Sequence, residues 1–181
     1  MTLKLKKTVA LVGMMGAGKT AVGRALAEIL GVAFLDSDLE IEKAANSTIP
    51  EIFSRDGEDF FRDREAEVLA RLMGEGPVIL STGGGAFLQD RNRAVIEEKG
   101  IAVWLKADLG LLWSRVKHKD TRPLLHTENP YQTLADLCTA REPTYGLAGV
   151  IVEAHPDYSI EDMAHKVCDA LAARPDVLEK D

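Results

Sequence analysis

One eight-residue stretch near the N-terminus constrains the fold more than any other part of the chain. Residues 13–20 read GMMGAGKT and match G-x-x-x-x-G-K-[ST], the pattern of a phosphate-binding loop. Residues 8–12 precede it as an apolar run typical of a buried strand, and residues 21–30 follow with one apolar helical face. Strand, glycine loop and helix together form the context that the motif requires, which a chance glycine turn would not explain.

The loop predicts a site for the terminal phosphates of a nucleoside triphosphate. Its glycines allow successive backbone N–H groups to point inward at a polyphosphate, and the helix N-terminus adds a partial positive charge. We expect Lys19 to reach the β- and γ-phosphates and the Thr20 hydroxyl to bind Mg²⁺.

Apolar runs farther along the chain predict four more strands, with helical segments between them. This alternation indicates an α/β fold of three layers, with a five-stranded parallel sheet between helices. The length of 181 residues suits one domain, and we expect residues 174–181 to be a frayed tail. The further strands are expected at residues 32–35, 78–80, 101–105 and 150–152. Helices are expected at residues 21–30, 39–45, 51–53, 59–73, 90–99, 109–118, 131–141 and 159–172.

Charge and composition exclude several classes of function. The net charge of −7 argues against a broad nucleic-acid surface. No run of about 18 apolar residues and no signal-peptide pattern is found, so we expect neither a membrane span nor secretion. The two cysteines lack metal-ligand spacing, which is typical of inert thiols in the cytoplasm. We expect a monomer.

Two carboxylates lie where the second expected strand ends. Asp36 and Asp38 follow residues 32–35, and ligands of open α/β sheets bind beyond the carboxyl ends of strands. Residues two apart in an extended stretch point the same way, so both could face one cleft. The alternative is that Asp38 merely caps the following helix.

A triple glycine follows the strand at residues 78–80. Ser81 and Thr82 come first, and then Gly83, Gly84 and Gly85 offer bare backbone to a ligand at close range. We favour a ligand contact over the alternative of a flexible turn.

The remaining polar residues point to a small anionic acceptor. Arg62 and Arg141 offer forks that fit a carboxylate or phosphate, although Arg62 could simply pair with Glu65 on the helix surface. Residues 117–129 are polar and read as a lid that brings Arg122 over the phosphates, with a solvated loop as the alternative. No Asn-Lys-x-Asp motif of a switch GTPase is present. The pattern therefore favours a small-molecule kinase, whose closed lid would exclude water.

The set and order of these motifs resemble the shikimate kinase family over nearly the whole chain. The resemblance implies the nucleoside-monophosphate-kinase-like fold, with a lid at about residues 117–129 and a substrate-binding segment at about residues 37–65. It also implies transfer of the ATP γ-phosphoryl group to the 3-hydroxyl of shikimate, on the route to chorismate and aromatic amino acids. The pieces that carry the resemblance are residues 13–20, 36–38, 61–65, 83–85, 122–125 and 141–145.

The resemblance also assigns roles by position. Asp38 would hold the shikimate hydroxyls and orient or deprotonate one of them. Lys19 and Arg122 would neutralise charge on the transferred group, and Arg115 would stack on adenine. The implied ATP contacts are Gly16, Ala17, Gly18, Lys19, Thr20, Ala21, Arg115, Arg122 and Pro156. The implied shikimate contacts are Asp38, Arg62, Gly84 and Arg141. The implied Mg²⁺ site comprises Thr20, Asp36 and Ser81.

Two rival functions stay open from the sequence. One is a related small-molecule kinase such as a gluconate kinase, which no motif specifically favours. The other is a protein that binds ATP without transferring its phosphate. Lys19 and the pair of aspartates, Asp36 and Asp38, speak against this second rival.

Overall fold

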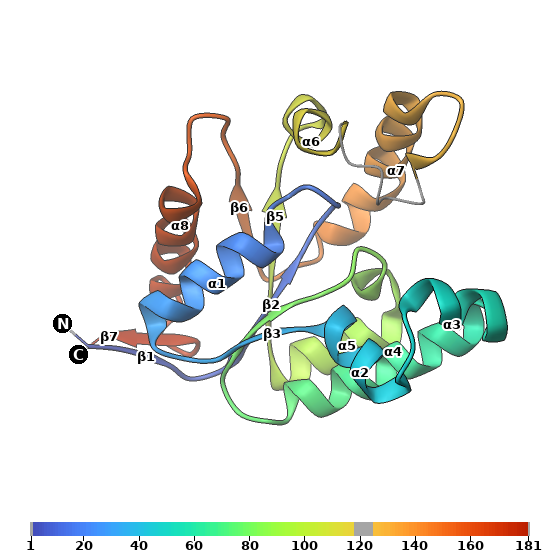
Figure 1. The fold of residues 1–181 in the computed structure, drawn as a ribbon. Coiled ribbons are helices and arrows are strands. Elements are labelled where there is room, and N and C mark those ends of the chain that lie inside the picture. Colours follow the sequence, from blue (N-terminus) through green and yellow to red (C-terminus); the bar gives the residue numbers. More distant parts are fainter. Residues whose placement is uncertain (1, 118–124, 181) are drawn as a thin grey trace.

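A computed structural model describes residues 2–117 and 125–180 and shows a parallel sheet between layers of helices (Figure 1). The sheet has five strands in the order β3-β4-β2-β5-β6, which confirms the predicted fold class. Its central strand is the one before the phosphate loop, and all five of its residues are buried. The strands are β2 (Thr8–Val12), β3 (Phe34–Asp36), β4 (Ile79–Ser81), β5 (Gly100–Lys106) and β6 (Val150–Glu153).

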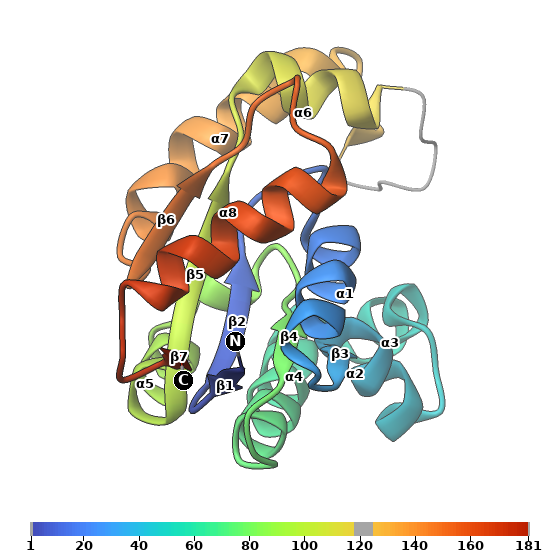
Figure 2. The same cartoon turned by 90° about the vertical axis from the view of Figure 1, so that its left-hand side faces the viewer.

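The helices pack in two groups on opposite faces of the sheet. Helices α1 and α8 lie side by side on one face, and α4 and α5 lie together on the other (Figures 1 and 2). Short helices α2 and α3 pack on α4 and extend beyond the end of the sheet. The helices are α1 (Lys19–Leu30), α2 (Ser37–Ala45), α3 (Ile49–Asp56), α4 (Glu58–Met73), α5 (Asp90–Lys99), α6 (Leu109–Val116), α7 (Pro130–Tyr145) and α8 (Ile160–Ala172), with a 3₁₀ turn, η1 (Ala86–Leu88).

Local capping signals set several helix starts. The Asp108 carboxylate accepts a hydrogen bond from the Leu111 N–H and thereby caps α6. Ser159 and Asp162 form a reciprocal capping box at the start of α8, as their spacing predicts. Among the described residues, no helix is both long and apolar enough to cross a bilayer.

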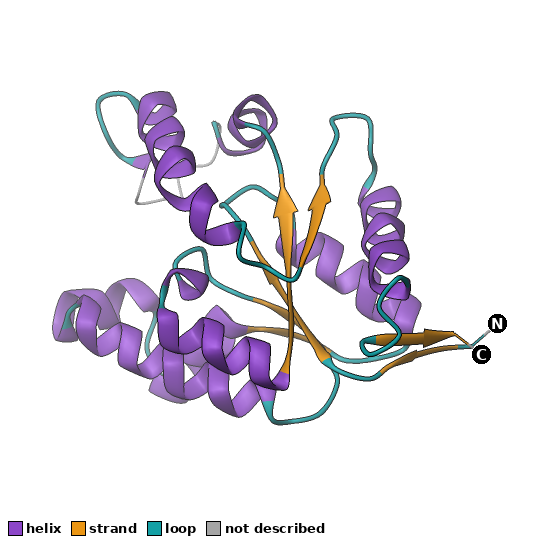
Figure 3. Cartoon of the chain, turned by 180° about the vertical axis from the view of Figure 1, so that it is seen from behind, coloured by secondary structure: helices purple, strands orange, loops and turns teal. Residues whose placement is uncertain are grey.

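The prediction of a frayed C-terminal tail is wrong. Residues Leu178–Lys180 form β7, which pairs antiparallel with β1 (Leu3–Leu5), and this ribbon brings the two ends of the chain together (Figure 3). Val177 and Leu178 are buried in the core. The pairing partner lies at the opposite end of the sequence, so no local pattern indicates it.

Helix α7 is longer than predicted, because Pro143 does not end it. The helix continues to Tyr145, with Pro143 inside its last turn. A proline so close to the end removes little of the hydrogen-bond ladder, and Tyr145 packs its buried ring against Trp104 at 5.8 Å between ring centroids. Tertiary packing therefore outweighs the local signal.

The expected lid is only partly within the described chain. Residues 118–124, and with them Arg122, lie outside the described residues. Leu125, which follows, is buried in the hydrophobic core, so this stretch is not polar and solvated throughout.

Candidate active site

A cleft of about 800 Å³ opens at the carboxyl ends of the strands. Its walls come from the phosphate loop (residues 13–20), the glycine loop (Gly83–Gly85), the start of α8 and side chains of α2, α4, α6 and α7. The predicted site residues that line it are Gly16, Ala17, Gly18, Lys19, Thr20, Ala21, Asp36, Asp38, Arg62, Ser81, Gly84, Arg115 and Arg141. Motifs spread over 126 residues of sequence therefore share one cavity.

The phosphate loop has the backbone shape that its glycines predict. Gly16 and Gly18 have φ angles of 82° and 92°, in a region that side chains rarely adopt. Gly18 occupies the cap position of α1 and has no side chain to accept from the first-turn amides, which leaves this helix start suited to an anion. The Lys19 ammonium donates to the carbonyls of Gly13 at 2.6 Å and Met14 at 3.2 Å, so it lies across the loop.

Asp36 and Ser81 stand opposite each other at the ends of two paired strands. They are register partners in the parallel pairing of β3 with β4, and both line the cleft with Thr20. One oxygen of Asp36 accepts from the amides of Asp38, at 2.9 Å, and Leu39. Asp36, and not Asp38, therefore caps α2, and β3 gives way to helix before Asp38 is reached. The expectation of one extended stretch is wrong, although both carboxylates do face the cleft.

The donor set of this corner suits magnesium. It consists of hydroxyl and carboxylate oxygens, which hard cations prefer. Across residues 2–117 and 125–180 no group of three or more histidine, cysteine or acidic residues could hold a metal ion. Mg²⁺ in phosphoryl-transfer sites is commonly held by one or two protein oxygens together with substrate phosphates, and the residues present fit that pattern.

Three functional side chains converge on the glycine loop. A Cβ placed on Gly83 would lie 2.7 Å from an Asp38 carboxylate oxygen, and one on Gly85 would lie 2.5 Å from an Arg62 guanidinium nitrogen. A Cβ on Gly84 would lie 3.3 Å from the Arg141 guanidinium. The glycines therefore leave room for these side chains, and each one lies beside a different charged group.

Arg62 is held by a buried carboxylate. Its Nη1 atom donates to Glu65 at 2.9 Å, and its Nε atom lies 3.7 Å from Glu58. Glu65 is only 2% exposed, so this pair is not the surface pair considered from the sequence. Burial raises the pKa of Glu65, and the neighbouring Arg62 opposes that rise. The spacing of Arg62 and Glu65 predicts that they pair, but it does not show that the Glu65 side chain is buried.

The Asp38 carboxyl is set in an unfavourable place for a charge. Burial raises its pKa above the ordinary aspartate value, and the nearby carboxylates of Asp36 and Glu42 add to the rise. Lys19 and Arg62 act in the opposite direction. Asp38 thus lies within electrostatic reach of both the phosphate-loop lysine and the glycine-loop arginine.

Side chains with planar groups line the part of the cleft beside α6 and the turn after β6. Arg115 donates from Nη1 to the Gly16 carbonyl at 3.0 Å, which fixes its guanidinium beside the phosphate loop. His155 and Tyr158, whose rings lie 5.3 Å apart, line the cleft after β6, and sequence reasoning missed both. Pro156 lies exposed in the turn between them.

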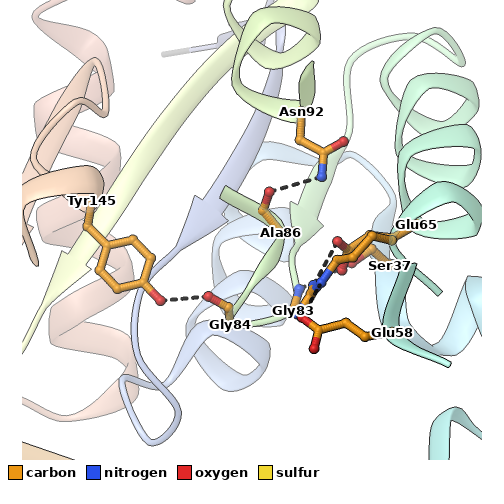
Figure 4. Close-up of polar contacts among 9 residues, drawn as sticks. Ser37, Glu58, Glu65, Gly83, Gly84, Ala86, Asn92 and Tyr145 are labelled. Atoms are coloured by element: carbon orange, nitrogen blue, oxygen red, sulfur yellow. Dashed lines mark hydrogen bonds and ion pairs between the residues drawn. The ribbon is translucent and has the colours of Figure 1, made fainter. Parts of the chain in front are cut away.

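Sequence reasoning also missed two residues that hold the glycine loop from behind. The Gly83 N–H donates to Ser37 Oγ at 3.3 Å, and the Tyr145 hydroxyl donates to the Gly84 carbonyl at 2.7 Å (Figure 4). Tyr145 lies four residues after Arg141, within residues 141–145, which carry part of the family resemblance. Its closeness in sequence to a predicted site residue was the signal that could have pointed to it.

Comparisons with known proteins agree on one family. Residues 15–172 match the family model of shikimate kinase. The shikimate kinase of Cereibacter sphaeroides is 62% identical over 178 residues, covering 98% of this chain and 89% of that relative. The structure of a shikimate kinase from Acinetobacter baumannii in complex with shikimate superposes with a TM-score of 0.86 at 43% identity, covering 93% of this chain and 94% of the other. A gluconokinase from Sinorhizobium meliloti covers 94% of each chain at a TM-score of 0.65, but its 16% identity shows a shared fold alone.

Proposed function

The chain belongs to the shikimate kinase family and is an enzyme that phosphorylates shikimate with ATP, and we propose how the residues of its cleft divide that work. The phosphoryl group moves from the γ-position of ATP to the 3-hydroxyl of shikimate. The observation that carries the assignment is that Asp38, Arg62 and Arg141 meet at the glycine loop in the same cleft as the phosphate loop.

ATP occupies the end of the cleft formed by the phosphate loop. The backbone from Gly16 to Ala21 surrounds the phosphates, and Lys19 exchanges its carbonyl partners for phosphate oxygens. The adenine lies against Arg115, near the turn that contains Pro156. Arg122, which lies outside the described residues, is assigned the neutralisation of charge on the transferred group.

Shikimate occupies the glycine-loop end. Its carboxylate is gripped by the forks of Arg62 and Arg141, because planar guanidinium groups match a carboxylate in two-point hydrogen bonds. Its ring hydroxyls reach Asp38 and the backbone of Gly84. With Glu65 holding Arg62 from behind, the fork needs little reorganisation to bind.

Thr20, Asp36 and Ser81 would hold Mg²⁺, which would supply positive charge beside the phosphates. Asp36 suits this role because only one of its oxygens caps α2, which leaves the other for the ion.

Asp38 acts first as an orienting acceptor for the attacking hydroxyl. Phosphoryl transfer of the loose type needs little early proton removal, so alignment of the hydroxyl with the γ-phosphorus contributes most. The proton passes to Asp38 as the new P–O bond forms and the bond to ADP breaks.

A panel of acceptors tests the function directly. ADP release with ATP and Mg²⁺ is measured by a coupled assay in the presence of shikimate, gluconate or no acceptor. We expect release to rise strongly with shikimate alone. A larger response to gluconate would assign the related sugar-acid kinase activity, and no response to any acceptor would favour an ATP-binding protein without transfer.

The carboxylate clamp gives a prediction on substrate affinity. Arg62→Lys and Arg141→Lys keep the charge but lose the two-point fork, so each is expected to raise the shikimate KM by about tenfold. The ATP KM should change by less than about twofold. Arg24→Lys, on the exposed side of α1, serves as the matched control. Unchanged shikimate KM values in both variants would contradict the clamp.

A further inference from the structure

A buried tyrosine, Tyr145, joins α7 to the glycine loop from behind the cleft. Its hydroxyl donates to the Gly84 carbonyl at 2.7 Å, and its ring packs against Trp104 at an interplanar angle of 36°. The hydrogen bond is drawn in Figure 4. The side chain is fully buried and is not part of the cleft lining. Tyr145 therefore contacts the machinery of the site without being exposed to a substrate.

The same hydroxyl also lies near Arg141, one turn away on α7. Burial raises the pKa of Tyr145, and the nearby Arg141 guanidinium opposes that rise. The raised pKa keeps the proton on the oxygen and preserves its donation to Gly84. A Cβ on Gly84 would lie 3.3 Å from the same guanidinium, so the tyrosine, the middle of the glycine loop and the arginine are neighbours.

The other side chains that hold this loop act at different points. Ser37 accepts from Gly83, and Asn92 donates from Nδ2 to the Ala86 carbonyl at 2.9 Å (Figure 4). Neither contacts Gly84 in these bonds, and neither is joined to Arg141 by them. Only the tyrosine, among these three, bonds the middle of the loop, at the glycine beside Arg141.

We propose that Tyr145 is a positioning residue for the acceptor: its hydroxyl fixes the orientation of the Gly84 peptide, beside which the Arg141 guanidinium lies. The proposal rests on the proposed function, in which Gly84 and Arg141 contact shikimate. Removal of the hydroxyl leaves the Gly84 carbonyl without this partner, and the peptide can then turn away from the acceptor and from the guanidinium beside it. The phosphate loop and Arg115 are not joined to Tyr145, so nucleotide binding should not depend on it.

Tyr145→Phe tests this proposal, because it removes one oxygen and retains the ring that packs on Trp104. We expect the shikimate KM to rise about tenfold, while the ATP KM stays within about twofold and kcat at saturating shikimate falls by less than about threefold. Tyr131→Phe, the same change at an exposed position of α7, should leave all three values unchanged.

A purely structural role would give a different result. Ligand-induced shifts of the melting temperature separate the two roles, since a ligand stabilises the fold according to its affinity. In Tyr145→Phe the shift caused by shikimate should shrink and the shift caused by ATP should persist. A lowered melting temperature with both KM values unchanged, or an equal rise in both, would overturn the proposal. Failure of the wild-type enzyme to use shikimate would instead overturn the proposed function.

Discussion

Lys19→Ala is expected to lower kcat by about a thousandfold or more while the protein stays folded. The Lys19 ammonium lies across the phosphate loop, held by the carbonyls of Gly13 and Met14. In the proposed reaction its charge lies beside the phosphates, where negative charge redistributes in the transition state. Removal of one preorganised charged donor from such a site commonly costs two to five orders of magnitude in rate.

The fold should tolerate this change because Lys19 is not part of the core. Its aliphatic stem leaves the first turn of α1 at the edge of the cleft, and alanine is an excellent helix former. Single-turnover assays with ATP and shikimate would measure the rate, and a thermal melt would measure the fold. Lys43→Ala, at a 73% exposed position of α2, is the matched control. A Lys19→Ala rate within tenfold of wild type would exclude the assigned role.

The parts of the site that were predictable depend on local sequence. The phosphate loop needs only the strand before it and the helix after it, so the octet at residues 13–20 indicated both its shape and its ligand. The carboxyl ends of β3 and β4 are likewise fixed by topology, because parallel strands bring Asp36 and Ser81 to one edge. For such features, chain order alone sets the geometry.

Other features depend on contacts between distant segments. The need for glycine at Gly85 comes from the Arg62 guanidinium beside it, which reaches the loop from α4. The burial of Glu65 follows from the way α4 packs, and the β1–β7 ribbon joins the first and last residues of the described chain. A periodicity shows which face of a helix is apolar, but it does not show what that face meets.

Asp38→Asn is expected to produce an inactive enzyme that is more stable than the wild type at neutral pH. Asparagine keeps the shape and one acceptor oxygen but removes the negative charge that, in the proposed mechanism, orients the attacking hydroxyl and receives its proton. Acid–base and orienting groups of this kind contribute about a hundredfold to ten-thousandfold in rate. We therefore expect kcat to fall by at least about a hundredfold, with the ATP KM little changed.

The expected gain in stability follows from the direction of the pKa shift. Burial, reinforced by Asp36 and Glu42, raises the pKa of Asp38 above its ordinary value of 3.8. Between the ordinary value and the raised value, the folded protein binds more protons at this position than the unfolded chain does. The free energy of unfolding therefore falls as pH rises through that window, and above it the ionised carboxylate destabilises the fold to its full extent. Asparagine carries no such penalty.

Melting temperatures of the two proteins across the pH range would measure this effect. The advantage of Asp38→Asn should be complete above the raised pKa and should disappear as pH falls below the ordinary aspartate value, where the wild-type carboxyl is protonated in both states. Asp169→Asn, at an exposed position of α8, should show no comparable gain, since solvent already stabilises its charge.

The wild-type kcat/KM for shikimate should fall on the acidic side at a pH above the ordinary aspartate pKa. An Asp38→Asn variant that is less stable than the wild type at neutral pH would contradict the burial of an uncompensated charge, and one that retains activity would show that the acceptor does not need this carboxylate. The joint expectation, greater stability with lost activity, is specific to a residue whose charge is kept in an unfavourable place for the sake of the reaction.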